Sequence, residues 1–121
     1  MKVTIGITTF NRFKYAKSLL KSLESLRDIS QIIVVDNCST ENGLREHLSL
    51  LKNEGMITDL FLRDPKERNW VNDEYIAKNI IIENSKSDVI LFLQDDLQYV
   101  FDAETFSKVL EDFRNEKEFK V

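Results

Sequence analysis

The chain has 121 residues, enough for one small domain with one hydrophobic core. Hydrophobic residues make up 42% and charged residues 31%, a balance typical of globular proteins and unlike that of disordered or fibrous chains. A formal net charge of −4 disfavours a nucleic-acid-binding platform, so we expect no nucleic-acid partner and favour a small molecule.

No stretch reaches the roughly 18 consecutive apolar residues of a membrane-spanning helix, and the alternating first residues do not resemble a signal peptide. We therefore expect no integral membrane segment and a cytoplasmic location, either free or peripheral to a membrane. Cys38 and His47 are the only cysteine and the only histidine. They leave no internal disulfide, and no His/Cys cluster for zinc or for a nucleophile pair.

The first half of the chain predicts two strands, each followed by a helix. Alternating apolar residues over 2–9 predict the first strand. Asn11 is expected to cap the next helix, which should end near Leu26. The apolar positions expected on its inner side are Tyr15, Leu19, Leu23 and Leu26. The β-branched run 32–35 predicts a second strand, and the short helix after it should end near Gly55. The inner side of that helix should carry Leu44, Leu48 and Leu51.

The second half continues the alternation. Residues 56–62 predict a third strand, and the charged segment 63–69 predicts a loop. The helix after this loop should end near Ser85. Its expected inner side consists of Val71, Tyr75, Asn79 and Ile82. The apolar run 89–93 predicts a fourth strand, buried on both faces. Asp102 is expected to cap a last helix. The expected inner side of that helix consists of Phe106, Val109, Leu110 and Phe113.

This alternation predicts an α/β fold, a mostly parallel sheet with helices on both faces, within one domain over residues 1–121. Polar residues follow three of the predicted strands, at 9–12, 36–37 and 94–96. The carboxyl ends of parallel strands meet at one edge of a sheet, and ligands of open α/β sheets bind there. We therefore expect a binding site where these three endings converge.

Asp95 and Asp96 are the most chemically specific of these residues. Adjacent carboxylates repel each other beside a buried strand, so a nearby cation would stabilise them, and hard oxygen ligands favour Mg²⁺ or Mn²⁺. The alternative is that the two acids only solvate a strand end and begin a turn. Similarly, Asp36 could cap the helix after Ser39, and Lys78 could be a solvated helix charge.

The motifs TTFNR at 8–12, VVDNCST at 34–40, AKN at 77–79 and FLQDD at 92–96 resemble a known family in their order and spacing. The resemblance is to the N-terminal, nucleotide-sugar-binding half of family 2 glycosyltransferases, which have the GT-A (Rossmann-like) fold. It spans about the whole chain, roughly Val3 to Phe101. It implies a glycosyltransferase of polysaccharide biosynthesis, with a nucleotide-diphospho-sugar such as a UDP-sugar as donor and a saccharide or lipid-linked hydroxyl as acceptor.

The resemblance also implies roles for individual residues. The nucleotide-binding residues would be Thr9, Phe10, Asn11, Arg12, Asp36, Lys78 and Asp95. Among these, Thr9 and Phe10 would lie along the nucleobase, and Asp36 would accept hydrogen bonds from the base or the ribose. Asp96, with Asp95, would bind the Mn²⁺ or Mg²⁺ that bridges the donor diphosphate.

The catalytic base of the family is an acid in a downstream acceptor-binding half. The resemblance therefore implies that this chain is the donor half of a longer, inverting enzyme, and the catalytic residue stays unassigned.

Two other classes share this pattern. A sugar-phosphate nucleotidyltransferase has the same architecture, but it usually carries a glycine-rich loop after the first strand, and Thr8–Arg12 contains no glycine. A non-catalytic nucleotide-binding module would keep the donor site without an acceptor half. Receiver-type domains place an acidic pair after the first strand, where this chain has Thr8 and Thr9.

Overall fold

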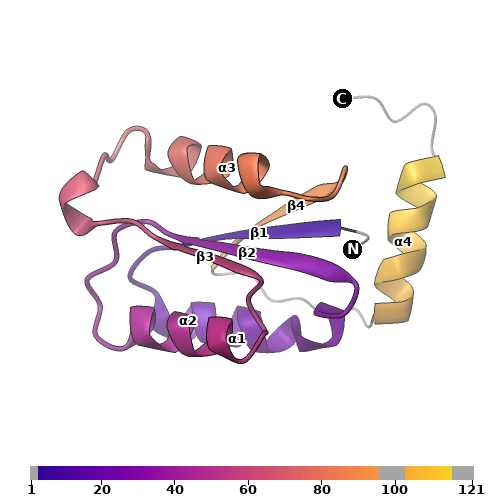
Figure 1. The fold of residues 1–121 in the computed structure, drawn as a ribbon, viewed down its shortest axis with the longest axis horizontal. Coiled ribbons are helices and arrows are strands. Elements are labelled where there is room, and N and C mark those ends of the chain that lie inside the picture. The colour runs from indigo at the N-terminus through magenta and orange to yellow at the C-terminus, as the bar shows by residue number, and fades with distance from the viewer. Residues whose placement is uncertain (1–2, 96–102, 116–121) are drawn as a thin grey trace.

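The computed structural model describes residues 3–95 and 103–115. In this part of the chain, a four-stranded sheet lies between layers of helices (Figure 1). The elements are β1 (Val3–Thr9), α1 (Phe13–Ser22), β2 (Ser30–Asp36), α2 (Leu44–Asn53), β3 (Asp59–Leu62), α3 (Asp73–Asn84), β4 (Ile90–Gln94) and α4 (Ala103–Asn115). Short 3₁₀ helices, η1 (Glu24–Leu26) and η2 (Pro65–Glu67), follow α1 and β3.

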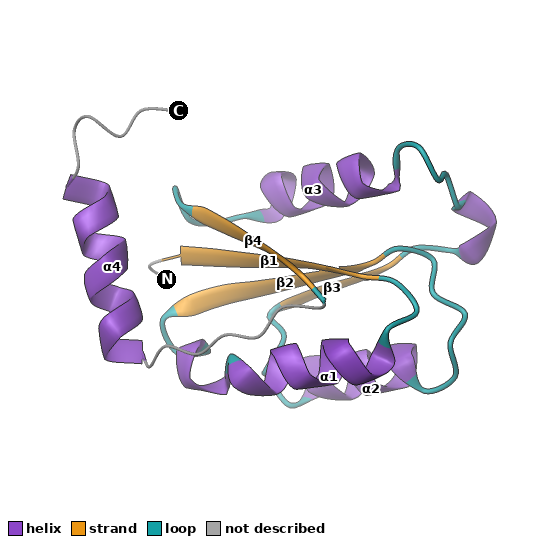
Figure 2. Ribbon diagram, turned by 180° about the vertical axis from the view of Figure 1, so that it is seen from behind, coloured by secondary structure: helices purple, strands orange, loops and turns teal. Residues whose placement is uncertain are grey.

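The strand order is β3-β2-β1-β4, and every neighbouring pair is parallel. Helices α1 and α2 cover one face of the sheet and α3 covers the other, while α4 runs across the amino-terminal ends of the strands (Figures 1 and 2). The predicted α/β fold with a parallel sheet is therefore confirmed.

The larger core cluster lies between the sheet and α1 and α2, and a smaller one joins Ile33 and Val35 of β2 to Ala77 and Ile81 of α3. On the α3 side the packing depends on Gly6 of β1. A Cβ at this position would lie 2.6 Å from Cγ2 of Ile81, so α3 can approach β1 this closely only over a glycine.

The start of the first helix differs from the prediction. Arg12 is its N-cap residue and makes no side-chain capping bond, and the helix gives way to η1 after Ser22. The side chain of Asn11 instead accepts hydrogen bonds from the loop after β2. Tyr15, expected to face inward, is 56% exposed, because Ala16, Leu19 and Leu20 already form the buried side of α1.

The inner side predicted for α3 is wrong. Val71, Tyr75 and Ile82 are 89%, 70% and 53% exposed, and Asn79 is exposed as well. The buried residues of α3 are Asp73, Ala77 and Ile81. The apolar residues of α3 are spread over most of its sides, so periodicity alone did not define the inner side. Ile81 is buried because it fits into the space over Gly6.

Strands β3 and β4 also differ from expectation. β3 begins at Asp59, although Met56 and Ile57 before it are buried. β4 is an edge strand of the described sheet, and none of its residues is fully buried, with Phe92 38% exposed.

In α4 only part of the predicted inner side is enclosed. Leu110 is buried, while Val109 and Phe113 are 55% and 43% exposed. Asp102, the expected cap, lies outside the described residues. Within the described residues, no helix combines the length and apolar character needed to cross a membrane.

Candidate functional site

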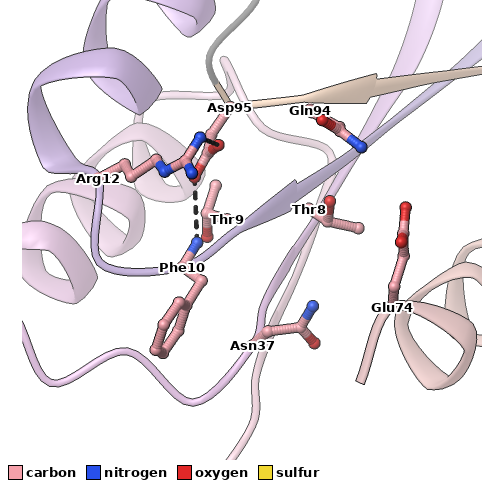
Figure 3. Close-up of a pocket in the computed structure, with 8 residues that line it drawn as sticks. All are labelled: Thr8, Thr9, Phe10, Arg12, Asn37, Glu74, Gln94 and Asp95. Carbon is pink, nitrogen blue, oxygen red and sulfur yellow. Dashed lines mark hydrogen bonds and ion pairs between the residues drawn. The ribbon is translucent and has the colours of Figure 1, made fainter. Parts of the chain in front are cut away.

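The carboxyl ends of β1, β2 and β4 bring the predicted residues to one edge of the sheet. The parallel register pairs Thr9 with Asp36 and Thr8 with Gln94. A hollow of about 190 Å³ opens at this edge (Figure 3). It is lined by Thr8, Thr9, Phe10, Arg12, Asn37, Glu74, Gln94 and Asp95. Figure 3 shows Arg12 beside Asp95 on one side of the hollow, with Thr8, Gln94 and Glu74 on the other.

Asp95 fixes the loop that follows β1. Its side chain is mostly buried, and Oδ2 accepts a hydrogen bond of 3.1 Å from the backbone N–H of Phe10. Nη1 of the half-exposed Arg12 lies 3.8 Å from Oδ1. The carboxylate thus connects the end of β4 to the loop after β1, and it places an anionic group beside a cation at the wall of the hollow.

Asp36 lies behind this wall and is fully buried. Its Oδ1 accepts hydrogen bonds from the hydroxyls of Thr9, at 2.8 Å, and Ser39, at 2.6 Å. Its Oδ2 accepts one from the backbone N–H of Ser39, at 3.0 Å, and lies 3.4 Å from Nε of Arg45. Asp36 is not the cap of α2, whose N-cap residue is Gly43. Its role toward a base or ribose stays a prediction.

The loops after β1 and β2 are joined through Asn11, which has a positive φ of 47°. The Asn11 backbone N–H donates to the Ser39 hydroxyl at 2.9 Å. Its side-chain oxygen accepts from the backbone N–H groups of Thr40 and Glu41, at 2.8 and 2.9 Å. Asparagine adopts this left-handed conformation more readily than most residues, and here it also satisfies two loop donors. Asn11 therefore serves the shape of the loop.

The guanidinium group of Arg68 stacks on the aromatic rings of Phe10 and Trp70, and so covers the loop residue Phe10. The Arg68 guanidinium carbon lies 3.6 Å from the centre of the Phe10 ring and 3.8 Å from that of Trp70. The two rings meet edge to face at 5.9 Å, and Trp70 is 76% exposed. Sequence reasoning did not single out Arg68. Nothing in the charged segment 63–69 marks it, because only the fold brings Phe10 beside this loop.

Asp73, at the start of α3, contacts the segment that carries Arg68 and Asn69. It is mostly buried, and Oδ1 accepts hydrogen bonds of 2.9 Å from Arg63 and from the backbone N–H of Asn69. Nε of Arg68 lies 2.9 Å from Oδ2. Burial alone would raise the pKa of Asp73, but the Asn69 N–H and the two arginines outweigh it and lower the pKa below its usual value.

The turn after β2 is held by the same arginines. Arg63 donates to the side-chain oxygen of Asn37, and Arg68 donates to the Asn37 carbonyl, each at 2.9 Å. The next residue, Cys38, is buried with a φ of 67°, and burial raises the pKa of its thiol although Arg63 opposes this. The thiol is therefore protonated near neutral pH.

Lys78 lies beside the hollow and does not line it. Its Nζ is 3.3 Å from the Glu74 carboxylate and 5.8 Å from the centre of the Phe92 ring. It lines a smaller hollow of about 110 Å³, which also has Thr8, Glu74 and Gln94 in its wall. Glu74 is a site residue that sequence reasoning missed, and its position on α3 offered no signal. Nucleotide binding by Lys78 stays a prediction.

The metal site is only partly described. Asp96, the principal predicted ligand, lies outside the described residues. Across residues 3–95 and 103–115, no three side chains of the His, Cys, Asp and Glu types gather into a metal cluster. The side chains of Asp95, Gln94 and Glu74 in the wall of the hollow carry oxygens of the type that binds Mg²⁺ or Mn²⁺, so the chemistry of the lining fits a hard divalent cation. Metal binding itself stays a prediction.

The parallel sheet with a hollow at the carboxyl ends of its strands is that of an open α/β protein, a class whose ligands bind at such an edge. Comparison with known proteins defines the family: residues 4–119 match glycosyl transferase family 2, and the chain belongs to it. It is 31% identical over 97 residues to the SPbeta prophage-derived glycosyltransferase SunS of Bacillus subtilis (strain 168). The same values hold for glycosyltransferase SunS of Bacillus phage SPbeta. The match covers 80% of this chain and 20% of each relative.

Solved structures of S. aureus TarS have the same fold. One TarS structure aligns with a TM-score of 0.72 and 22% identity, over 93% of this chain and 20% of its own. The TarS 1-349 structure in complex with UDP gives the same TM-score and identity, over 94% of this chain and 32% of its own. The chain therefore spans about a fifth of the relatives and of the longer TarS chain that it matches.

Proposed function

We propose that this chain is the donor-binding domain of an inverting glycosyltransferase that uses a UDP-sugar and a divalent metal ion. The observation that carries the proposal is the hollow at the ends of β1, β2 and β4, lined by Phe10, Arg12 and Asp95. Membership of glycosyl transferase family 2 and the UDP complex of TarS, a protein of the same fold, support it. The acceptor in this proposal is a saccharide or lipid-linked hydroxyl.

The nucleobase and the diphosphate of the donor would each have a counterpart among these residues. The nucleobase would lie along Thr9 and Phe10, where the Arg68 guanidinium already stacks on the ring. Arg12, half-exposed at the wall, supplies a cation for the diphosphate end. Asp95 holds the Phe10 N–H and so keeps the loop in place for both ends. Asp36 would act from behind, by fixing Thr9.

Asp95 and the adjacent Asp96 would hold Mn²⁺ or Mg²⁺. When bound, this ion would act as a Lewis acid that neutralises charge on the departing diphosphate. Inversion also needs a base that removes the proton of the acceptor hydroxyl, and we assign no residue of this chain to that role. Lys78, paired with Glu74 beside the hollow, is proposed to approach the diphosphate.

Titration calorimetry tests the proposal. The 121-residue chain should bind UDP, and its affinity for UDP should fall in EDTA. The two carboxylates of one dipeptide hold a divalent ion weakly by themselves, so the ion should bind together with the phosphate oxygens of UDP. Asp96→Asn should remove the difference between Mn²⁺ and EDTA. Asp88→Asn is the matched control, because Asp88 is exposed and pairs with Arg114 of α4, so its UDP affinity should not change. Failure of the wild-type chain to bind UDP would contradict the proposal, and equal affinity in EDTA would contradict its metal part.

A further inference from the structure

Asp73 has no direct part in the proposed donor site, because it does not line the hollow. Its side chain is 8% exposed and contacts the loop that carries Arg68 and Trp70, through Arg68 and the backbone N–H of Asn69. A buried carboxylate is unfavourable unless cations and hydrogen-bond donors surround it. Asp73 has both, in the guanidinium groups of Arg63 and Arg68 and the backbone N–H of Asn69.

The position of Arg68 over Phe10 is set by contacts at the edge of its guanidinium. Nε lies 2.9 Å from Oδ2 of Asp73, and Nη1 donates to the Asn37 carbonyl at 2.9 Å. These contacts leave the faces of the planar group to stack on aromatic rings. The Nε contact is a close ion pair without an aligned hydrogen bond, so charge attraction is what holds this end of Arg68.

Asp73 also compensates a repulsion. Both Arg63 and Arg68 reach Asn37, so their positive charges lie close together at the end of β2. The Asp73 carboxylate lies within 2.9 Å of a nitrogen of each. Without its charge the two guanidinium groups would repel, and the more exposed Arg68 would move more easily than the buried Arg63. Such a movement would uncover Phe10.

We propose that Asp73 is a positioning residue for nucleotide recognition, which acts through Arg68 on the base-binding surface at Phe10 and not on the diphosphate end. The inference rests on the proposed function, because it assumes that the nucleobase lies along Phe10. The inference predicts a difference between two ligands. Loss of the Asp73 charge should weaken the recognition of a nucleoside and leave that of a bare diphosphate unchanged.

The first experiment compares UDP with inorganic pyrophosphate by calorimetry in the presence of Mn²⁺. Asp73→Asn keeps the side-chain size and removes the charge, and it should weaken UDP binding about tenfold, the effect of one charge-assisted contact. Pyrophosphate binding should not change. Asp59→Asn is the matched control, since Asp59 accepts a hydrogen bond from Gln31 at the opposite end of the sheet, and it should affect neither ligand. Equal weakening of both ligands by Asp73→Asn would overturn the inference.

The second experiment is a double-mutant cycle with Arg68→Gln. If Asp73 acts through Arg68, Asp73→Asn should cause no further loss of UDP affinity in the Arg68→Gln chain. Additive losses would show that Asp73 acts elsewhere and would overturn the inference. If circular dichroism shows that the Asp73→Asn chain is unfolded, Asp73→Glu offers the same comparison, because it keeps the charge but displaces it. Asp73→Glu should still weaken the binding of UDP and leave that of pyrophosphate unchanged. A wild-type chain that binds pyrophosphate but not UDP would overturn the proposed function itself, whatever the variants do.

Discussion

At the scale of single residues, the carboxylate of Asp36 has a different role from the one that its position in the sequence indicates. Asp36 ends β2, where a ligand-binding acid would lie, yet it is fully buried and accepts hydrogen bonds from Thr9 and Ser39. A buried acceptor surrounded by donors contributes to folding by satisfying them. Asp36 therefore gives the loops of the proposed donor site their shape without any ligand.

The first prediction is that Asp36→Asn destabilises the fold. The amide would turn an N–H toward donors that now meet an oxygen, so the free energy of unfolding should fall by about 1–3 kcal/mol. Urea denaturation of the two proteins measures this. Asp88→Asn, at an exposed ion pair, is the control and should change the free energy of unfolding by less than about 1 kcal/mol. Equal stability of Asp36→Asn and the wild type would show that these hydrogen bonds contribute nothing.

At the scale of elements, close approach between α3 and the sheet decides which side of α3 is buried. Ile81 of the helix fits over Gly6 of β1, and Ala77 and Ile81 pack on β2. Helices α1 and α2, on the other face, are joined by the contact of Phe13 with His47, whose ring centres are 5.3 Å apart. Both contacts can be tested by substitution.

The second prediction concerns the contact of α3 with β1. Gly6→Ala places a methyl group 2.6 Å from Cγ2 of Ile81 and should destabilise the chain by about 1–3 kcal/mol, as overpacking does. In an Ile81→Ala background the same substitution should have much less effect, because the space is then available. Thermal denaturation of the four proteins in this cycle gives the interaction. A cost of Gly6→Ala that is the same in both backgrounds would contradict this packing.

The third prediction uses the only histidine of the chain. Burial lowers the pKa of His47 below its usual 6.5, and Lys17 adds to this effect. The unfolded chain therefore binds a proton more readily than the folded one, so stability should fall as the pH drops from about 7 to about 5. His47→Phe keeps a ring against Phe13 and should reduce this pH dependence. Urea denaturation at several pH values across that range measures the free energy of unfolding. If this free energy depends on pH equally in the variant and the wild type, His47 is not the group responsible.

At the scale of the whole molecule, burial is concentrated in the two central strands. Every residue of β2 is buried, and β1 is nearly as enclosed, whereas Leu110 is the buried residue of α4. Local stability follows buried apolar contact and hydrogen bonding. The loops of the proposed donor site are therefore attached to the most protected strands, and α4 lies at the other end of the sheet (Figure 1).

The fourth prediction is a gradient of amide hydrogen exchange. Amides of β1 and β2 should exchange most slowly, and those of α4 faster by orders of magnitude, since local opening of this helix exposes little buried surface. Leu110→Ala should speed exchange in α4 while β2 stays nearly unchanged. Protection of α4 equal to that of β2 would show that this helix unfolds only with the whole chain.

Most of the fold followed from local patterns, because alternating strands and helices with short links allow few arrangements other than a parallel sheet. The edge where Thr9, Asp36 and Asp95 meet could be predicted for the same reason. The buried side of α3 could not. It depends on the space over Gly6, which belongs to a strand far away in the sequence. The edge position of β4 likewise depends on strand order, which no local run contains.

The sequence by itself determined the α/β class, the polar strand ends and the motif order that resembles family 2 glycosyltransferases, since these properties depend on residue type and spacing alone. Only the tertiary structure decided that Asp36 is enclosed, that Arg68 stacks on Phe10 and Trp70, and that Asp73 holds the arginines together. These contacts join the loop after β1 to the segment between β3 and α3, and a pair distant along the chain meets only once the sheet has formed. Their charges and rings act over a few ångströms, so their roles exist only in the folded chain.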